Sequence, residues 1–224
     1  MKKLLIATLL TLATLGAAQA APITVGEPTS AGNCFPFSCL ASREGTQYQQ
    51  VYTGDAFPGA GTIDGISLYR AIGGGMDGAT FTLYLSTTSA QVNALDGANL
   101  NANLGADNAF FGQYTIGGEM PEVLRFEGLP FHYDPAQGNL LLNVLISAPT
   151  STGIPTSYFL ADGRGSVTSR ALAAGGISGA DAAGLVTTFD FTPDGEVPEP
   201  ASLLLLGVGL AGLAQARRRA HGRA

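Results

Sequence analysis

Cys34 and Cys39 are the only two cysteines of the chain, and their thiols are its most reactive groups. Only four residues separate them, so a disulfide between them would close a tight loop. A zinc site would need two further ligands, and redox dithiols favour a C-x-x-C spacing near a helix. In an oxidising compartment the pair predicts one structural disulfide, which pins the N-terminal segment to the body and adds at most ~2 kcal/mol.

Acid–base chemistry has few candidates. His132 is the single histidine between residues 21 and 196, and no G-x-S-x-G sequence offers it a serine nucleophile. Glu119, Glu122 and Glu127 are near one another in sequence, but a glycosidase depends on a separation in space that sequence does not give. A solvated strand edge explains the three glutamates, and a lone histidine on a strand is more often a surface residue or a satisfied core residue. We therefore predict no catalytic residue, and a secreted hydrolase is the less favoured alternative.

A segment rich in Asn and Asp could hold a metal. Carboxylate and amide oxygens suit a hard cation such as Ca²⁺. The same residue types also form ordinary turns, and the spacing departs from an EF-hand. Ca²⁺ is the only cofactor we consider, against an Asx-turn loop as the alternative. The candidate ligands are Asp96, Asn99, Asn101 and Asp107.

The elements that would position these groups are short strands, because apolar and polar residues alternate through most of residues 50–192. Within residues 80–87, the apolar residues Phe81, Leu83 and Leu85 stand at alternate positions. Gly- and Pro-containing turn sequences separate such stretches. Strands are expected at 49–52, 65–72, 80–87, 110–116, 123–126, 140–147, 158–161, 165–172 and 185–191.

Many short strands joined by Gly-rich turns predict an all-β fold, an antiparallel β-sandwich of jelly-roll or Greek-key type. Residues 140–146 are almost continuously apolar, which predicts a central strand buried on both faces. Only residues 89–104 are expected to hold a helical turn or two. The sandwich would be flanked by an N-terminal signal helix and a C-terminal transmembrane helix.

The charge of residues 21–196 restricts the partners of this body. It contains 16 acidic residues against five arginines and no lysine, a formal balance of −11. Because a polyanion such as DNA would be repelled, we expect no nucleic-acid partner. Sandwiches often bind carbohydrate, which is an analogy of fold alone. The chain has no Trp, but its seven tyrosines offer rings either for sugar stacking or for packing within the sheets.

Residues 1–20 have the three parts of a secretory signal peptide. Lys2 and Lys3 precede an apolar stretch over residues 4–15, and small residues end in Ala18-Gln19-Ala20. An apolar run of this length is too short to span a bilayer, which disfavours the alternative of a retained anchor. We therefore predict cleavage after Ala20 and export of a domain at residues 21–196.

Residues 197–224 form a tail of three parts. A proline-bearing motif at 197–201 is followed by an apolar stretch at 201–216 and an arginine cluster at 217–223. At ~1.5 Å per residue, a helix over the apolar stretch would span ~24 Å, less than the ~30 Å hydrocarbon core. It would anchor the protein transiently, with the arginines in the cytoplasm. The key residues are Val197, Pro198, Glu199 and Pro200 in the motif and Arg217, Arg218 and Arg219 in the cluster.

This tail resembles a PEP-CTERM sorting signal, for which an ordinary membrane anchor is the alternative. The resemblance implies that an exosortase-type membrane protease recognises the tail and cuts near the motif, while the protein is held in the inner membrane. It also implies a final location in the cell envelope or outside the cell. The body is similar to a group of PEP-CTERM proteins with no assigned activity, through motifs such as Asn33-Cys34-Phe35-Pro36-Phe37.

Together these features predict an exported, non-enzymatic protein of the cell envelope or extracellular matrix. The second hypothesis is a carbohydrate- or Ca²⁺-dependent binding module, with extracellular polysaccharide as its partner. Low charge and abundant Gly and Thr are typical of both classes.

Overall fold

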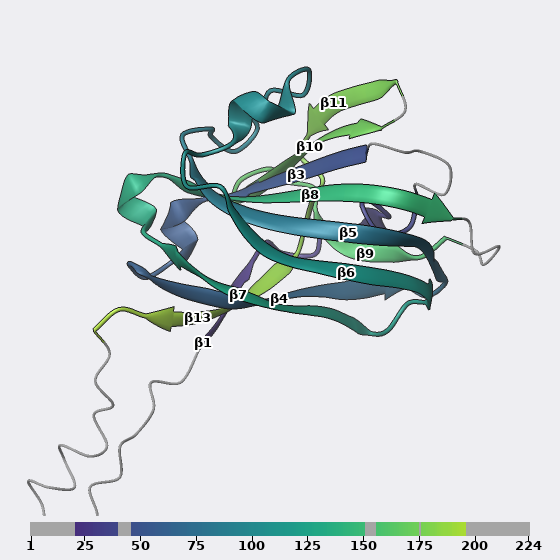
Figure 1. Ribbon diagram of the computed structural model, residues 1–224, viewed down its shortest axis with the longest axis horizontal. Coiled ribbons are helices and arrows are strands. Elements are labelled where there is room, and N and C mark those ends of the chain that lie inside the picture. The colour runs from purple at the N-terminus through teal and green to yellow at the C-terminus, as the bar shows by residue number, and fades with distance from the viewer. Residues whose placement is uncertain (1–20, 40–45, 151–155, 175, 196–224) are drawn as a thin grey trace, which may run out of the picture. The chain divides into compact units, whose positions relative to one another are not determined.

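The computed structural model describes residues 21–39, 46–150, 156–174 and 176–195. Ala20–Asp194 forms one compact unit with its own core, built almost entirely of strands (Figure 1). The predicted signal peptide and the predicted sorting tail with its membrane helix lie outside the described residues. Within the described part of the chain, no helix is long and apolar enough to cross a membrane.

The predicted all-β sandwich is confirmed, because the strands form two antiparallel sheets. The seven-stranded sheet contains β1 (Ala21–Val25), β2 (Ser30–Asn33), β4 (Gly61–Ile72), β7 (Val123–Tyr133), β9 (Tyr158–Asp162), β12 (Gly184–Leu185) and β13 (Thr187–Pro193). The six-stranded sheet contains β3 (Thr46–Tyr52), β5 (Gly75–Thr88), β6 (Ala109–Glu119), β8 (Asn139–Thr150), β10 (Thr168–Ala174) and β11 (Ile177–Asp181). Three 3₁₀ helices lie between strands: η1 (Gly54–Ala56), η2 (Leu100–Asn103) and η3 (Pro135–Gln137).

Strands distant in sequence lie side by side in both sheets. The seven-stranded sheet has the order β1-β13-β4-β9-β12, with β7 also beside β4 and β2 beside β9. The six-stranded sheet has the order β11-β10-β3-β8-β5-β6. β4 is long enough to change neighbours, since its first eight residues lie between β13 and β7, and Arg70 and Ile72 pair with β9.

The core between the sheets is formed by the alternating apolar residues. Phe81 and Leu83 of β5 are completely buried, as the alternation predicts, and so are Ile66 of β4 and Phe189 of β13. Burial of each such side chain contributes on the order of 2 kcal/mol. The aromatic side chains of this core therefore supply much of the stability of the sandwich.

A smaller core lies on the outer side of the six-stranded sheet, beneath the loop of residues 89–108. Leu95 and Leu100 of this loop pack against Val51, Leu141 and Ala171 of the sheet. Helix η2 in the loop confirms the helical turn expected there, but η1 and η3 are helical turns outside the one stretch that was expected to hold any, since each is a tight turn with a Thr or Asp N-cap. A Cβ added at Gly97 would stand 2.5 Å from the backbone of Gly179 in β11, so only glycine allows this close approach.

The prediction of a doubly buried strand holds for only part of β8. Residues 140–144 are buried on both faces because the 89–108 loop covers their outer side. Leu145 is 40% exposed, which corrects the prediction for the end of the strand. The expected strand at 185–191 is two strands, separated at Val186, and β1, β2 and β11 were not predicted. β1 and β11 are short and mostly exposed, and β2 has only four residues, so all three lack a clear apolar pattern.

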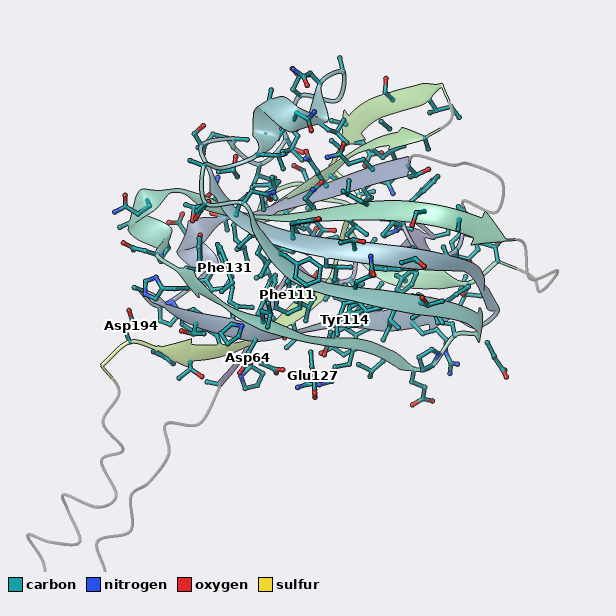
Figure 2. All side chains as sticks on the ribbon, in the orientation of Figure 1. Asp64, Phe111, Tyr114, Glu127, Phe131 and Asp194 are labelled. Carbon is teal, nitrogen blue, oxygen red and sulfur yellow. A yellow bond between two sulfur atoms is a disulfide. The ribbon has the colours of Figure 1, made fainter. Side chains whose placement is uncertain are left out.

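One side of the sandwich is closed by β6 and β7, which belong to different sheets (Figure 2). Phe111 of β6 lies between the sheets, and its ring fills the space beside Gly128 of β7. Any Cβ at Gly128 would be 2.5 Å from that ring. Tyr114 of β6 donates a hydrogen bond to the backbone of Glu127 on β7.

Candidate functional site

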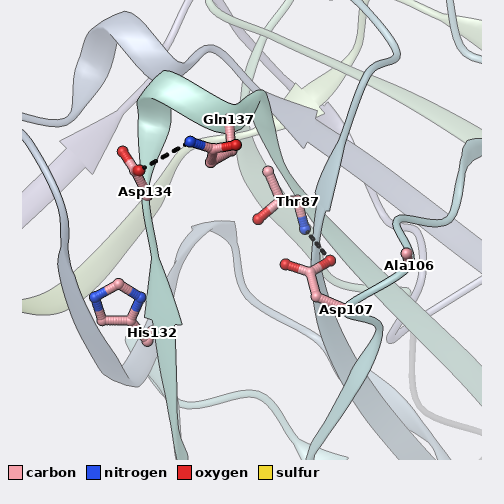
Figure 3. Close-up of a pocket in the computed structure, with 6 residues that line it drawn as sticks. All are labelled: Thr87, Ala106, Asp107, His132, Asp134 and Gln137. Atoms are coloured by element: carbon pink, nitrogen blue, oxygen red, sulfur yellow. Dashed lines mark hydrogen bonds between the residues drawn. The ribbon is translucent and has the colours of Figure 1, made fainter.

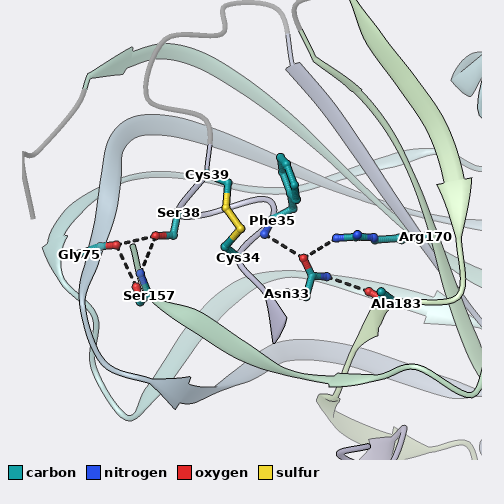
Figure 4. The surroundings of a disulfide bond; sticks show 9 residues. All are labelled: Asn33, Cys34, Phe35, Ser38, Cys39, Gly75, Ser157, Arg170 and Ala183. Carbon is teal, nitrogen blue, oxygen red and sulfur yellow. Dashed lines mark hydrogen bonds between the residues drawn. A yellow bond between two sulfur atoms is a disulfide. The ribbon is translucent and has the colours of Figure 1, made fainter. Parts of the chain in front are cut away.

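The disulfide loop confirms the predicted pairing of Cys34 with Cys39, whose Cα atoms are 5.5 Å apart (Figure 4). Phe37 between them is buried in the main core, with its ring centroid 4.9 Å from that of Phe81. Ser38 is also buried, and its hydroxyl donates to the carbonyl of Gly75 over 2.6 Å. The disulfide closes this loop, and Phe37 and Ser38 within the loop contact the sandwich, whereas the expected contribution of the disulfide itself stays a prediction.

Arg170 on β10 joins this loop to the six-stranded sheet. Its guanidinium donates to Asn33 Oδ1 and lies over the ring of Phe35, 5.5 Å from the centroid. Asn33 also accepts from the amide of Phe35 and donates from Nδ2 to the carbonyl of Ala183. One buried asparagine and one arginine therefore connect three segments that are distant in the sequence.

The charge of Arg170 is balanced by Asp181 on the neighbouring strand β11. The guanidinium makes two hydrogen bonds to the carboxylate, of 2.7 and 2.9 Å. Burial alone would lower the pKa of Arg170, but the hydrogen bond to Asp181 raises it. Burial alone would raise the pKa of Asp181, but hydrogen bonds from Arg170 and the amide of Ala183 lower it. Both groups therefore stay charged at neutral pH.

The four residues expected to hold Ca²⁺ all lie in the exposed part of the 89–108 loop. Asp96 Oδ1 accepts from the amides of Ala98 and Asn99, each over 2.8 Å, which is an Asx-turn arrangement. Asp107 Oδ1 accepts from the amide of Thr87 on β5 over 2.8 Å. Among the described residues, no group of three or more His, Cys, Asp or Glu side chains lies close enough to hold a metal. The Ca²⁺ site stays a prediction.

A buried network of amide side chains beneath this loop was missed by the sequence analysis. Asn103 donates to Gln49 Oε1 over 2.9 Å and accepts from the amide of Asp96 over 2.8 Å. Gln49 in turn donates to the carbonyl of Leu100 and to Asn143 on β8. Because buried polar groups need partners, this network fixes the loop on the sheet. The available signal was the pair of glutamines at positions 49 and 50 directly before Val51 and Tyr52 in an expected strand.

An open pocket of about 370 Å³ lies where β5, β7 and the 89–108 loop meet (Figure 3). Several of its polar groups already have partners within the chain. Asp134 accepts from the amide of Ala136 over 3.0 Å and from Gln137 Nε2 over 3.3 Å, which caps η3. The pocket is lined by Thr87, Ala106, Asp107, His132, Asp134 and Gln137.

The candidate acid–base residues are not brought together. His132 borders the pocket, but its Nε2 lies 2.8 Å from Oδ2 of Asp194, and both side chains are more than half exposed. Glu122 and Glu127 are exposed and pair with Arg70 and Arg125 respectively. These positions are those of a solvated surface, as the sequence analysis favoured.

The comparisons with known proteins add one finding at the C-terminus. Residues 196–219 match the model of the PEP-CTERM protein-sorting motif. No curated protein and no solved structure matches the chain. The motif marks an exported protein that is anchored transiently in the membrane and processed by an exosortase. Because the match covers the tail, the resemblance predicted for the body stays a prediction.

Proposed function

We propose that this exosortase-sorted chain is a non-enzymatic protein of the cell envelope or extracellular matrix. Cleavage of the tail releases its sandwich in folded form. The observation that carries the proposal is the sorting motif, which begins at residue 196, just after β13 ends at Pro193. A cut within the motif leaves every strand of the described residues in place. The domain therefore keeps its complete core after processing.

The proposal that the protein is not an enzyme is supported by the hydrogen bonds that the carboxylates around the pocket already make. A general base must have an atom available to the proton that it removes. Asp134 Oδ1 caps η3 by accepting from the amide of Ala136, Asp134 Oδ2 accepts from the side chain of Gln137, and Asp107 Oδ1 accepts from the amide of Thr87. These carboxylates hold the backbone and side chains around the pocket in place, which is a structural role.

The experiment is an intact-mass measurement on protein isolated from its native envelope. We expect a mass that begins at Ala21 and ends near Pro200, without the arginine cluster. A variant with Pro198→Ala and Glu199→Ala is expected to retain the whole tail, whereas the surface control Glu122→Gln is processed as the wild type. A wild-type mass that includes Arg217 to Ala224 would contradict the proposal.

A second candidate function is binding of carbohydrate by the sandwich. It is favoured by Tyr84 and Phe110, whose rings meet in an edge-to-face pair with centroids 5.9 Å apart. Phe110 is 46% exposed, although its neighbour Phe111 is buried. Exposed aromatic rings have an apolar face to offer to a ligand.

A further inference from the structure

The outer side of the six-stranded sheet has a group of neighbouring uncharged side chains next to the 89–108 loop. Its residues are adjacent in the strand register: Thr82 pairs with Gln113 on β6 and with Leu145 on β8, and Leu145 pairs with Gln47 on β3. We call this region the open face. It consists of Gln47, Thr80, Thr82, Tyr84, Phe110, Gln113, Thr115, Leu145 and Ser147.

The side chains of the open face are held in place by hydrogen bonds among themselves. Gln113 donates to the hydroxyl of Thr82 over 3.0 Å, and the hydroxyls of Thr80 and Thr115 are 3.2 Å apart. Gln47 donates to Asn143 at the edge of the covered region over 2.8 Å. Each hydroxyl and amide has both donor and acceptor capacity. The face is therefore an ordered array of neutral hydrogen-bonding groups beside an aromatic pair.

The opposite outer surface, on the seven-stranded sheet, is charged. Arg125 of β7 lies 2.6 Å from Asp190 of β13 and 3.2 Å from Glu127. Asp64 and Glu127 are exposed there (Figure 2). The open face therefore differs in charge from this opposite surface, although both belong to one strongly acidic domain.

This difference in charge indicates which kind of partner fits the open face. An acidic polymer would be repelled by a body with a formal charge of −11, and a cationic partner would favour the charged surface. An uncharged, hydroxyl-rich polymer would not be repelled by the acidic body, and the charged surface would not offer it a stronger binding site. Its hydroxyls would exchange hydrogen bonds with Gln113 and the threonines, and its apolar C–H groups would stack on the exposed ring of Phe110.

We propose that the open face binds a neutral polysaccharide, with Tyr84 and Phe110 as the stacking platform. The inference rests on the proposed extracellular function, since it needs the sandwich to meet polysaccharide outside the cell. Phe110 and Tyr84 form the apolar end of the face, and Gln113 and Thr115 form its polar end. A charge placed on the polar end would be desolvated by the polymer and would oppose binding.

The test is native affinity electrophoresis of residues 21–196 through gels that contain a neutral β-glucan, a neutral α-glucan or a galactomannan, with alginate as the acidic counterpart. We expect retardation by at least one neutral polymer and none by alginate. Phe110→Ala is expected to weaken binding about tenfold, and Thr115→Glu to abolish it. Leu129→Ala, which shortens an exposed apolar side chain on β7, is the matched control and should bind as the wild type.

Three outcomes would overturn the inference. These are no retardation by any neutral polymer, unchanged binding by Thr115→Glu, and a dimer of the wild type in light scattering that Thr115→Glu dissociates. Unchanged melting temperatures would exclude misfolding of the variants. Processing of the tail is measured separately by intact mass, so glucan binding without processing would contradict the proposed function and leave the open face supported.

Discussion

The hydroxyl of Tyr114 on β6 donates a 2.7 Å hydrogen bond to the backbone carbonyl of Glu127 on β7. β6 and β7 belong to different sheets, so this bond crosses the side on which the sandwich closes. The ring of Tyr114 also packs on Phe126, with centroids 4.8 Å apart. The contact joins the edge of the open face to the edge of the charged sheet.

Replacement of Tyr114 by Phe should therefore loosen this closure while leaving ring packing intact. Loss of the hydrogen bond is expected to lower the free energy of unfolding by about 1 kcal/mol. Urea denaturation of Tyr114→Phe checks this value, with Tyr158→Phe on β9 as a control for loss of a hydroxyl. Equal stability of Tyr114→Phe and the wild type would show that the bond contributes nothing.

Arg170 should matter more than the disulfide for attachment of the N-terminal segment. The disulfide closes a very short loop and is expected to add at most ~2 kcal/mol. Arg170→Lys keeps the charge but loses the two-bond contact with Asp181 and the contact with Asn33, which should cost about 2–3 kcal/mol. Thermal melts of Arg170→Lys and of the Cys34→Ser, Cys39→Ser double variant give the comparison. A larger loss in the double variant would contradict this ranking.

Stability should fall steeply in alkali because of buried tyrosines. Burial raises the pKa of Tyr48 and of Tyr52, both fully buried, whereas an unfolded tyrosine ionises near pH ~10. The folded state thus holds the phenolic proton more tightly. The contribution of the protonated tyrosines to the free energy of unfolding is complete below pH ~10. Above that pH it declines by about 1.4 kcal/mol per pH unit for each tyrosine.

Urea titrations from neutral pH to above pH ~10 measure this decline. Tyr52→Phe should make the decline shallower, because one of the two groups no longer ionises in the unfolded state. The variant also loses the 2.9 Å hydrogen bond between Tyr52 and Thr187, so its stability at neutral pH is the baseline for comparison. A slope identical to that of the wild type would exclude Tyr52 as a contributor.

Any effect of Ca²⁺ on the melting temperature depends on the 89–108 loop, which contains the four candidate ligands. Asp96 and Asp107 already accept backbone hydrogen bonds, so the loop is held by contacts within the chain. We expect the melting temperature to be the same with excess Ca²⁺ and with EDTA. A rise with Ca²⁺ that Asp96→Asn removes would instead identify the site that the sequence pattern allows.

The sequence by itself determined the features that depend on neighbours along the chain. Alternation over residues 80–87 selects which side chains of β5 face the core, because successive residues of a strand point to opposite sides. The spacing of Cys34 and Cys39 allows a tight loop, and the order of motif, apolar stretch and arginines defines the sorting tail. Each is a local pattern that needs no knowledge of the fold.

Only the tertiary structure decided which strands lie side by side, and therefore what each outer surface presents. Phe110 meets Tyr84 because β6 pairs with β5, and Leu145 meets Gln47 because β8 pairs with β3. Gln49 is buried because a loop some 50 residues later in the chain covers it. Such contacts depend on register between distant segments, and alternation within a single strand contains no information about its partner.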